Sequence, residues 1–265
     1  MRGAPTQVLT WGQERAQTGP WTGRPWIPGA RVAHLTPLQS GASPAGPHGV
    51  WPADDLVGTR GAVSLVFLRR CMSTLAGQGY TSLVTTALTD PQAQPFYALG
   101  FVDHERLHLL TRNLDRPIPP PPVRVHSLRG HHRQRVLALD AMAFDDDWRL
   151  APAGLDEALA ATPSARLRVV LADDSNPKTV CGYAVSGRAG ACGYLQRLAV
   201  HPQHRRLGIA QALVADGLRW MRRNRVSQAM VNTQVGNHGA LALYQRLGFS
   251  LRPGDLRILR LDFAS

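Results

Sequence analysis

The sequence predicts an α/β protein (α+β in the broader sense), in which strands and helices alternate and the chain divides into two halves. A strand, a basic turn and a helix follow one another between Gly193 and Met221. A second strand, a second helix and a Gly-Phe pair follow between Met230 and Phe249. A run with five prolines, from Asp115 to Val123, separates this part from the rest of the chain. Because proline lacks a backbone N–H and holds φ fixed, this run predicts a semi-rigid linker.

The individual elements follow from hydrophobic periodicity and from turn residues. In the C-terminal half the pattern predicts strands over residues 123–127, 166–172, 179–186, 191–200 and 229–234, and helices over residues 131–143, 154–161, 207–223 and 237–247. In the N-terminal half it predicts a helix over 64–75 and strands over 81–87 and 106–111. The first ~50 residues are rich in proline and tryptophan and carry no clear pattern. The predicted domains are residues 1–116 and 123–265, with a Pro-rich linker at 117–122.

The basic turn has the sequence Arg205-Arg206-Leu207-Gly208-Ile209-Ala210, an R-x-x-G-x-A arrangement. Gly208 allows the backbone to approach an anion without a Cβ in the way. Unpaired N–H groups at the helix start and the helix dipole add positive potential at the same point. The turn lacks the patterns of a P-loop and of a dinucleotide-binding fold. It therefore predicts a pyrophosphate-binding turn of another kind, with an ordinary surface-basic turn as the alternative.

A second block lies at the distance that one helix and one strand require. Its fixed positions are Asn237, Ala240, Leu243, Tyr244, Gly248 and Phe249. Together the two blocks resemble the GNAT superfamily of acyl-CoA N-acyltransferases, whose motifs are Q/R-x-x-G-x-G/A and N-x-x-A-x-x-L-Y-x-x-x-G-F. The resemblance covers residues 123–263. It implies a mixed central sheet with flanking helices, acetyl-CoA as co-substrate, no metal, and direct attack by a primary amine in a ternary complex.

The resemblance also implies the site residues. The cofactor-binding residues would be Leu198, Ala199, Val200, Arg205, Arg206, Leu207, Gly208, Ile209, Ala210, Gln211, Asn237 and Tyr244. The strands ending at Val200 and Gln234 would splay apart and admit the pantetheine arm, with the Leu198 N–H polarising the thioester carbonyl. Tyr244 would protonate the departing thiolate. The alternative for Tyr244 is a core tyrosine on an amphipathic helix.

The sequence does not identify the general base or the acceptor amine. The strand residues Tyr194 and Gln196 have no useful basicity. Residues 145–147, all aspartates, either attract a cationic amine or form a solvated turn. His201 either relays a proton through water or lies on the surface, and ordered water is the fallback. Small molecules and proteins are both possible acceptors, and oligomeric state and acyl-chain preference are not predicted.

An internal repeat crosses the linker. Shifted by 148 residues, Gly100-Phe101 falls on Gly248-Phe249. Phe96 falls where Tyr244 stands, so the hydroxyl is missing in the first copy. We therefore expect a degenerate N-terminal GNAT-like domain, an intact C-terminal one and a single acetyl-CoA site in the latter, with an unrelated α/β cap as the alternative. This tandem layout also resembles the mycothiol synthases, which acetylate a cysteinyl amine on a glycoside.

Charge and composition narrow the class of protein. The net charge of +12 allows a basic nucleic-acid binder, but the arginines are scattered and coenzyme A itself carries several phosphate charges. A non-catalytic acyl-CoA-binding regulator is the other alternative to an enzyme. No apolar run approaches the ~20 residues of a membrane span, and the start lacks the apolar core of a signal peptide. Three cysteines without a C-x-x-C pattern indicate reduced thiols. We expect a cytoplasmic enzyme without a membrane partner.

Overall fold

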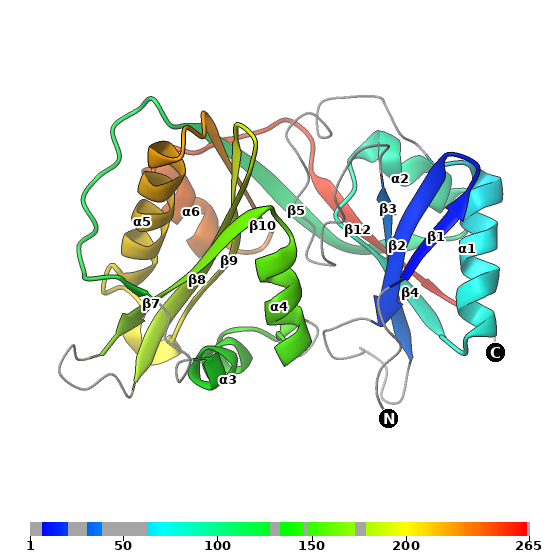
Figure 1. Ribbon diagram of the computed structural model, residues 1–265, viewed down its shortest axis with the longest axis horizontal. Coiled ribbons are helices and arrows are strands. Elements are labelled where there is room, and N and C mark those ends of the chain that lie inside the picture. Colours follow the sequence, from blue (N-terminus) through cyan, green and yellow to red (C-terminus); the bar gives the residue numbers. More distant parts are fainter. Residues whose placement is uncertain are drawn as a thin grey trace.

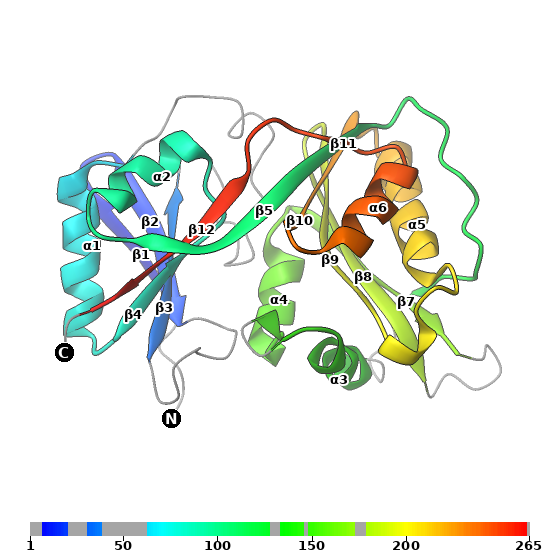
Figure 2. The same ribbon diagram turned by 180° about the vertical axis from the view of Figure 1, so that it is seen from behind.

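The computed structural model describes residues 7–20, 31–38, 63–127, 133–145, 148–172 and 179–263. Over these residues the strands join into one mixed sheet in the order β1-β2-β3-β4-β12-β5-β10-β9-β8-β7-β6, while the short β11 pairs with β5 beside this path. The twisted sheet runs through both halves of the molecule, and helices flank it (Figures 1 and 2). The predicted α/β architecture, with a mixed sheet, flanking helices and two halves, is confirmed.

The elements follow the predicted alternation of strands and helices. In the N-terminal half they are β1 (Gln7–Trp11), β2 (Glu14–Pro20), β3 (Val32–Leu38), α1 (Leu65–Gly77), β4 (Ser82–Thr85), α2 (Asp90–Tyr97) and β5 (Val102–Asn113). In the C-terminal half they are β6 (His126–Ser127), α3 (Arg133–Ala143), α4 (Pro152–Ala160), β7 (Ser164–Leu171), β8 (Val180–Ala189), β9 (Cys192–Val200), the 3-10 helix η4 (Pro202–His204), α5 (Ile209–Arg223), β10 (Gln228–Gln234), α6 (His238–Arg246), β11 (Ser250–Leu251) and β12 (Leu256–Asp262).

Two parts of the sequence prediction need correction or addition. The strand predicted at residues 123–127 is too long, because only β6 pairs, with β7. The prolines before Val123 have no N–H to donate, so the chain joins the sheet late. The sequence pattern made no prediction for the strands β1, β2, β3, β11 and β12 or for the helix α2. Pro37 lies within β3, and proline in a strand normally argues against that assignment.

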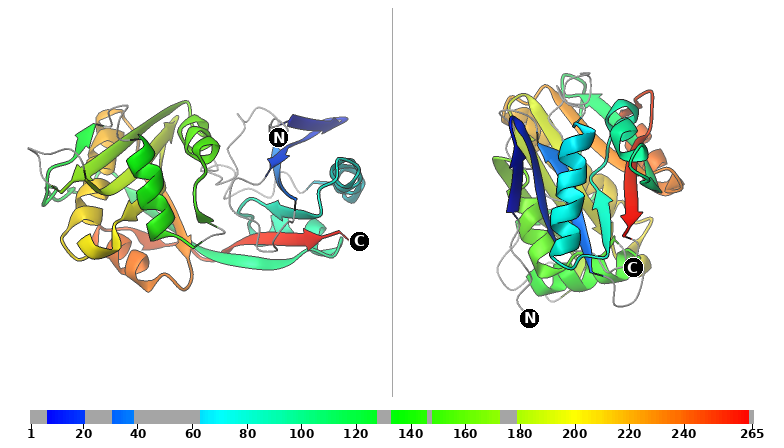
Figure 3. Two further views of the ribbon diagram at one scale, coloured as in Figure 1. Left: turned by 90° about the horizontal axis from the view of Figure 1, so that it is seen from below. Right: turned by 90° about the vertical axis from the view of Figure 1, so that its right-hand side faces the viewer.

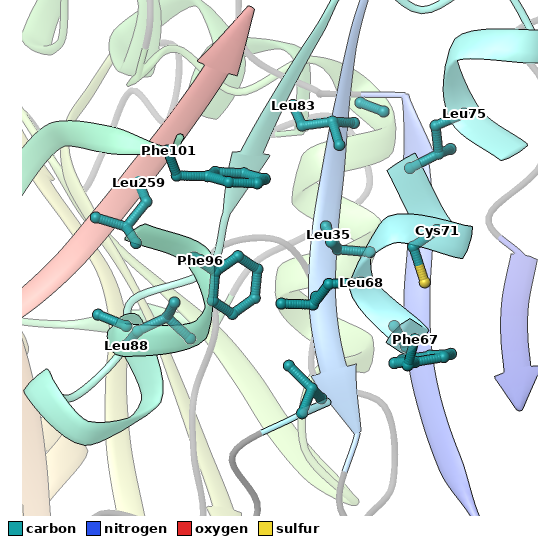
Figure 4. Packing of buried hydrophobic residues seen from close by; sticks show 14 of the residues in the cluster. Leu35, Phe67, Leu68, Cys71, Leu75, Leu83, Leu88, Phe96, Phe101 and Leu259 are labelled. Atoms are coloured by element: carbon teal, nitrogen blue, oxygen red, sulfur yellow. The ribbon is translucent and has the colours of Figure 1, made fainter. Parts of the chain in front are cut away.

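The core of the N-terminal half lies between α1, α2 and the sheet (Figure 4). Ser64 caps α1 by accepting the Phe67 N–H at 3.2 Å. One face of α1 then buries Phe67, Leu68, Cys71 and Leu75, at the spacing of an amphipathic helix. Leu259, from the far end of the chain, packs into the same core.

The helices of the C-terminal half form a layer on each face of the sheet. One apolar cluster joins α5 and α6 to β9, β10 and β5. Another joins α3 and α4 to β7, β8 and β9. The left view of Figure 3 shows the two layers with the strands between them. Within the described part of the chain, no helix is long and apolar enough to cross a membrane.

The Pro-rich segment packs on the C-terminal half. It has no regular structure, as predicted, but Ile118 is buried in the cluster of α5 and α6. Arg112, on β5, donates a hydrogen bond to the Pro117 carbonyl at 2.6 Å. Arg219, on α5, reaches the Ile118 carbonyl at 3.5 Å. The segment is therefore fastened along the surface at several points.

The two halves exchange their closing strands. The first part of β5 pairs with β12, from Val102↔Arg260 to Leu107↔Leu256. The rest of β5 pairs with β10, from Leu107↔Gln234 to Asn113↔Gln228. The strand β12 in turn lies between β4 and β5, so the end of the chain completes the N-terminal sheet. Each half thus supplies one strand that the sheet of the other half requires.

We predict that residues 123–265 do not fold as a monomer when produced alone. Without β5, the edge of β10 loses its partner and β12 has no strand on either side, which leaves rows of unpaired backbone groups. Size-exclusion chromatography and circular dichroism of the fragment, alone and co-expressed with residues 1–122, test this. Aggregation alone and recovery on co-expression are expected. A monomeric fragment with a cooperative unfolding transition would contradict the prediction.

Candidate active site

The basic turn before α5 has the backbone geometry that its glycine predicts. Gly208 caps α5 with φ 77°, a left-handed conformation that glycine adopts without strain. Arg206 also has a positive φ, 68°. The side chains of Arg205 and Arg206 are exposed, and the first turn of α5 contains no acidic residue. The helix start therefore presents free N–H groups beside two cations, an arrangement suited to a phosphate.

The strands β9 and β10 separate next to this turn. They pair in parallel only from Cys192↔Gln228 to Tyr194↔Met230, although both continue for several residues. On the other side of β9, the His201 N–H donates to the Cys181 carbonyl of β8 at 2.8 Å. Because N–H directions alternate along a strand, the N–H groups of Leu198 and Val200 point the opposite way, into the gap. The expected splay of the two strands is confirmed.

A cavity of about 680 Å³ connects the turn with the splayed strands. Its lining consists of Ala143, Phe144, Leu198, Ala199, Val200, His204, Arg205, Arg206, Gly208, Ile209, Ala210, Gln211, Asn237, Gly239, Ala240, Leu243 and Arg246. All the predicted cofactor-binding residues are present except Leu207, which is exposed, and Tyr244.

Three lining residues that were not predicted lie outside both sequence motifs: Ala143, Phe144 and His204. A fourth, Arg246, occupies an unspecified position within the second motif. Arg246 follows Gly239 by seven residues on α6, so helical spacing could have placed both on one face. Phe144 comes directly after α3, and no local pattern indicates its role.

The second motif forms the wall made by α6. The Asn237 side chain caps this helix by accepting the Ala240 N–H at 3.1 Å. Tyr244 is buried, its ring meets Phe249 edge-on at a centroid distance of 5.7 Å, and burial raises the pKa of its phenol. Its neighbour Leu243 lines the cavity. The burial of Tyr244 thus agrees with a packed core tyrosine. Its role as the acid that protonates the thiolate stays a prediction.

The opposite wall is held by a buried charge network that the sequence did not reveal. Asp140, on α3, is fully buried and accepts hydrogen bonds from the Leu150 N–H at 2.7 Å, from the Tyr183 hydroxyl and from Arg197. Burial, foremost, raises the pKa of Tyr183, so its hydroxyl stays protonated as a donor. The network ties α3, β8, β9 and the segment before α4 together.

Arg197 carries the network to the cavity wall. Its guanidinium lies 3.6 Å from the centre of the Phe144 ring and donates to the Trp148 carbonyl at 2.5 Å. Trp148 in turn packs against an apolar cluster that includes Leu107 and Leu256 of the exchanged strands. The sequence offered one signal for this network, which is that Asp140 occupies a core position of α3. A charged group is rarely buried without a partner.

The residues considered as bases have structural roles or lie elsewhere. Asp145 is exposed, and its carbonyl accepts N–H groups of Trp148 and Arg149, as in a turn. Residues 146 and 147 lie outside the described part of the chain. His201 accepts the Gln203 N–H at 3.2 Å and caps η4. Among the described residues, no group of three or more His, Cys, Asp or Glu side chains could hold a metal ion.

Comparison with known proteins shows which family part of the chain resembles. Residues 133–249 match the model of the acetyltransferase (GNAT) family. A tandem GNAT protein from the clavulanic acid biosynthesis pathway is similar in structure, with a TM-score of 0.65 over 100% of this chain and 86% of that one at 17% identity. An N-acetyltransferase from Kribbella flavida has a TM-score of 0.59, covering 98% and 90% at 13% identity. The family match therefore covers less than half of the chain, and the likeness to these solved structures shows that the whole chain has the fold of a tandem GNAT protein.

A curated relative is similar at the level of sequence. The mycothiol acetyltransferase of Salinispora arenicola is 33% identical over 178 residues. The match covers 57% of this chain and 54% of the relative, so it spans about half the length of that protein.

We predict that Asp140→Ala lowers the free energy of unfolding by about 3–5 kcal/mol, because Arg197 would keep its buried charge and lose its counterion. Urea unfolding of the variant measures the change. Asp156→Ala is the matched control, since Asp156 is an exposed carboxylate that pairs with Arg133 at 2.6 Å. The control should cost no more than about 1 kcal/mol. Equal effects in the two variants would contradict the structural role of the network.

Proposed function

We propose that the protein is an acetyl-CoA-dependent N-acetyltransferase, which transfers an acetyl group to a primary amine by direct attack in a ternary complex. The observation that carries the proposal is the cavity that joins the start of α5 to the gap between β9 and β10. The match of residues 133–249 to the GNAT family supports the same reaction class. It also favours an acyltransferase over a non-catalytic acyl-CoA binder or a basic nucleic-acid binder.

The described residues suit the pyrophosphate, the pantetheine arm and the thioester of the coenzyme. The pyrophosphate would lie on the N–H groups after Gly208, beside Arg205 and Arg206. The pantetheine arm would enter the gap as an additional strand and bond the free backbone groups of Leu198 and Val200. The Leu198 N–H would then polarise the thioester carbonyl, a contribution of ~10²–10³ in rate for a single donor.

The chemical step needs a neutral amine and a protonated leaving group. The amine nitrogen attacks the carbonyl carbon, the C–N bond forms, and the C–S bond breaks. Tyr244 supplies the proton to the sulfur, and its raised pKa keeps the phenol protonated until that moment. The nitrogen loses one proton to ordered water as the C–N bond forms, and the phenol regains a proton from solvent.

The relationship to mycothiol acetyltransferase suggests a narrower acceptor as a second proposal. The acceptor would be the mycothiol precursor that lacks the acetyl group, a cysteinyl amine on a glycoside. Coenzyme A release with this precursor, compared with benzylamine, glucosamine and a lysine peptide, tests it. A preference for any of the other three amines would reject the narrower proposal and leave the general one in place.

We predict that Gly208→Val abolishes acetyl-CoA binding with the fold retained. A Cβ at this position would lie 2.9 Å from Pro122 Cγ, and a branched residue is strained at φ 77°. Arg206→Gly removes a charge while it suits the positive φ, so it should weaken binding by only about 1.5–3 kcal/mol. Calorimetry measures both affinities, and circular dichroism checks the fold. Wild-type affinity in Gly208→Val would remove the main support for the proposal.

We predict that Tyr244→Phe lowers kcat about 100-fold or more and leaves acetyl-CoA affinity unchanged, because only the proton donor is removed while the ring still packs on Phe249. Thiol release with the best acceptor measures kcat, and calorimetry measures the affinity. An unaltered kcat would assign Tyr244 to the core. If no amine supports turnover and the protein binds nucleic acid with strong salt dependence, the binder alternative is correct.

A further inference from the structure

The exchanged strand β5 brings a carboxylate of the N-terminal half to the catalytic half. Leu110 packs toward α5 and α6, whereas Leu107 and Leu109 pack on the other face, with Trp148. Because side chains alternate along a strand, Glu105 shares the face of Leu107 and Leu109. Its register partner on β12, Ile258, belongs to the same cluster as Trp148. Glu105 therefore lies on the face of the sheet that carries Trp148.

Glu105 also contacts the end of β10, beyond the residues at which β10 pairs with β9. On β10, Ala229 and Val231 face α5 and α6. Because side chains alternate along a strand, Gln234 points to the opposite face of the sheet, the face that carries Trp148. Gln234 donates its side-chain amide to Glu105 at 2.9 Å. The Gln234 carbonyl accepts the N–H of Asn237 at 2.9 Å, and Asn237 lines the cavity.

The hydrogen bonds of Glu105 leave its charge unmatched. One carboxylate oxygen accepts from Gln234 and the other from the Arg106 N–H at 3.1 Å, and both donors are neutral. None of the ion pairs formed among the described residues includes Glu105. The Arg106 side chain instead pairs with Asp255 at 2.6 Å, and Asp255 also contacts His108. A half-buried carboxylate without a cation is a place where a cation can bind.

We propose that Glu105 binds the ammonium group of the acceptor and accepts the first proton that it loses. The proposal deepens the proposed function and rests on it. The ammonium gives one proton to the carboxylate, and the resulting amine attacks the thioester. The C–N bond forms and the C–S bond breaks. The nitrogen loses its second proton in this step. One of the two protons ends on the sulfur of coenzyme A, and the other reaches solvent.

The site would be a composite of both halves. The cavity is lined by Arg205, Arg206 and Arg246, which suit a polyanion and repel an ammonium group. Neither β9 nor β10 contains an acidic residue. The carboxylate at the acceptor end comes from β5 through the strand exchange. A degenerate first half would thereby keep a function in acceptor recognition.

The test compares Glu105→Gln with the wild-type protein on two amines of similar shape. Benzylamine is cationic near neutral pH, and aniline is neutral. The kcat/KM for benzylamine should fall about 100-fold, the size of a general-base contribution, and that for aniline by less than about threefold. The acetyl-CoA affinity should not change. Asp103→Asn is the matched control, because Asp103 lies on the same strand but contacts Arg257 and Tyr97 of the opposite layer.

An equal fall for both amines, or no fall, would overturn the role of Glu105 while leaving the proposed function intact. If the wild-type protein acetylates no amine, the proposed function fails. Calorimetry of benzylammonium with coenzyme A bound then tests the site alone. Loss of binding in Glu105→Gln, with binding kept in Asp103→Asn, supports the site. Equal affinity in the two variants, or no binding to the wild-type protein, overturns it.

Discussion

The pairing of β5 with two partners is the constraint on which the rest of the structure depends. A buried backbone N–H or carbonyl must find a hydrogen-bond partner, and the sheet of each half ends in a strand that cannot find one within its own half. The strand β5 serves β12 with its first residues and β10 with its last. Because β12 also requires β4, the two halves close each other's sheet. The position of β10, and with it the end of the gap, is thus set by a strand of the other half.

Sequence reasoning predicted most of the elements but not this pairing. Amphipathic periodicity and turn residues are local, and they identified α1, α5 and α6 with small errors at the ends. The repeat shift of 148 residues aligned Gly100 with Gly248, and both glycines follow a helix and have a positive φ. Which strand a closing strand joins is decided by non-local hydrogen bonds, and the side-chain pattern of β12 is the same beside either neighbour. The proline run predicted a linker between two domains, and in the structure it contacts α5 and β5, which the sequence did not indicate.

The candidate site divides in the same way. The backbone parts of the site were predictable. A glycine at position 208 indicates a positive φ, and the start of a helix always leaves free N–H groups. The parts made by side chains were not. Asp140 and Arg197 meet only after α3 packs on β9, and Glu105 reaches β10 only through the strand exchange. Their roles depend on tertiary neighbours, which no spacing along the chain records.

The two ends of the cavity place opposite demands on charge. In the proposed function an anionic coenzyme would bind beside the cations before α5, and their potential extends over about 8 Å at physiological salt. In a chain with a net charge of +12, the acceptor end would otherwise be unfavourable for an ammonium group. The ion pair with Asp255 neutralises the charge of the nearby Arg106, and Glu105 adds a local negative charge. The exchange of strands therefore does more than join the two halves in this proposal, because it separates the cations that would bind the coenzyme from the carboxylate that would receive the amine.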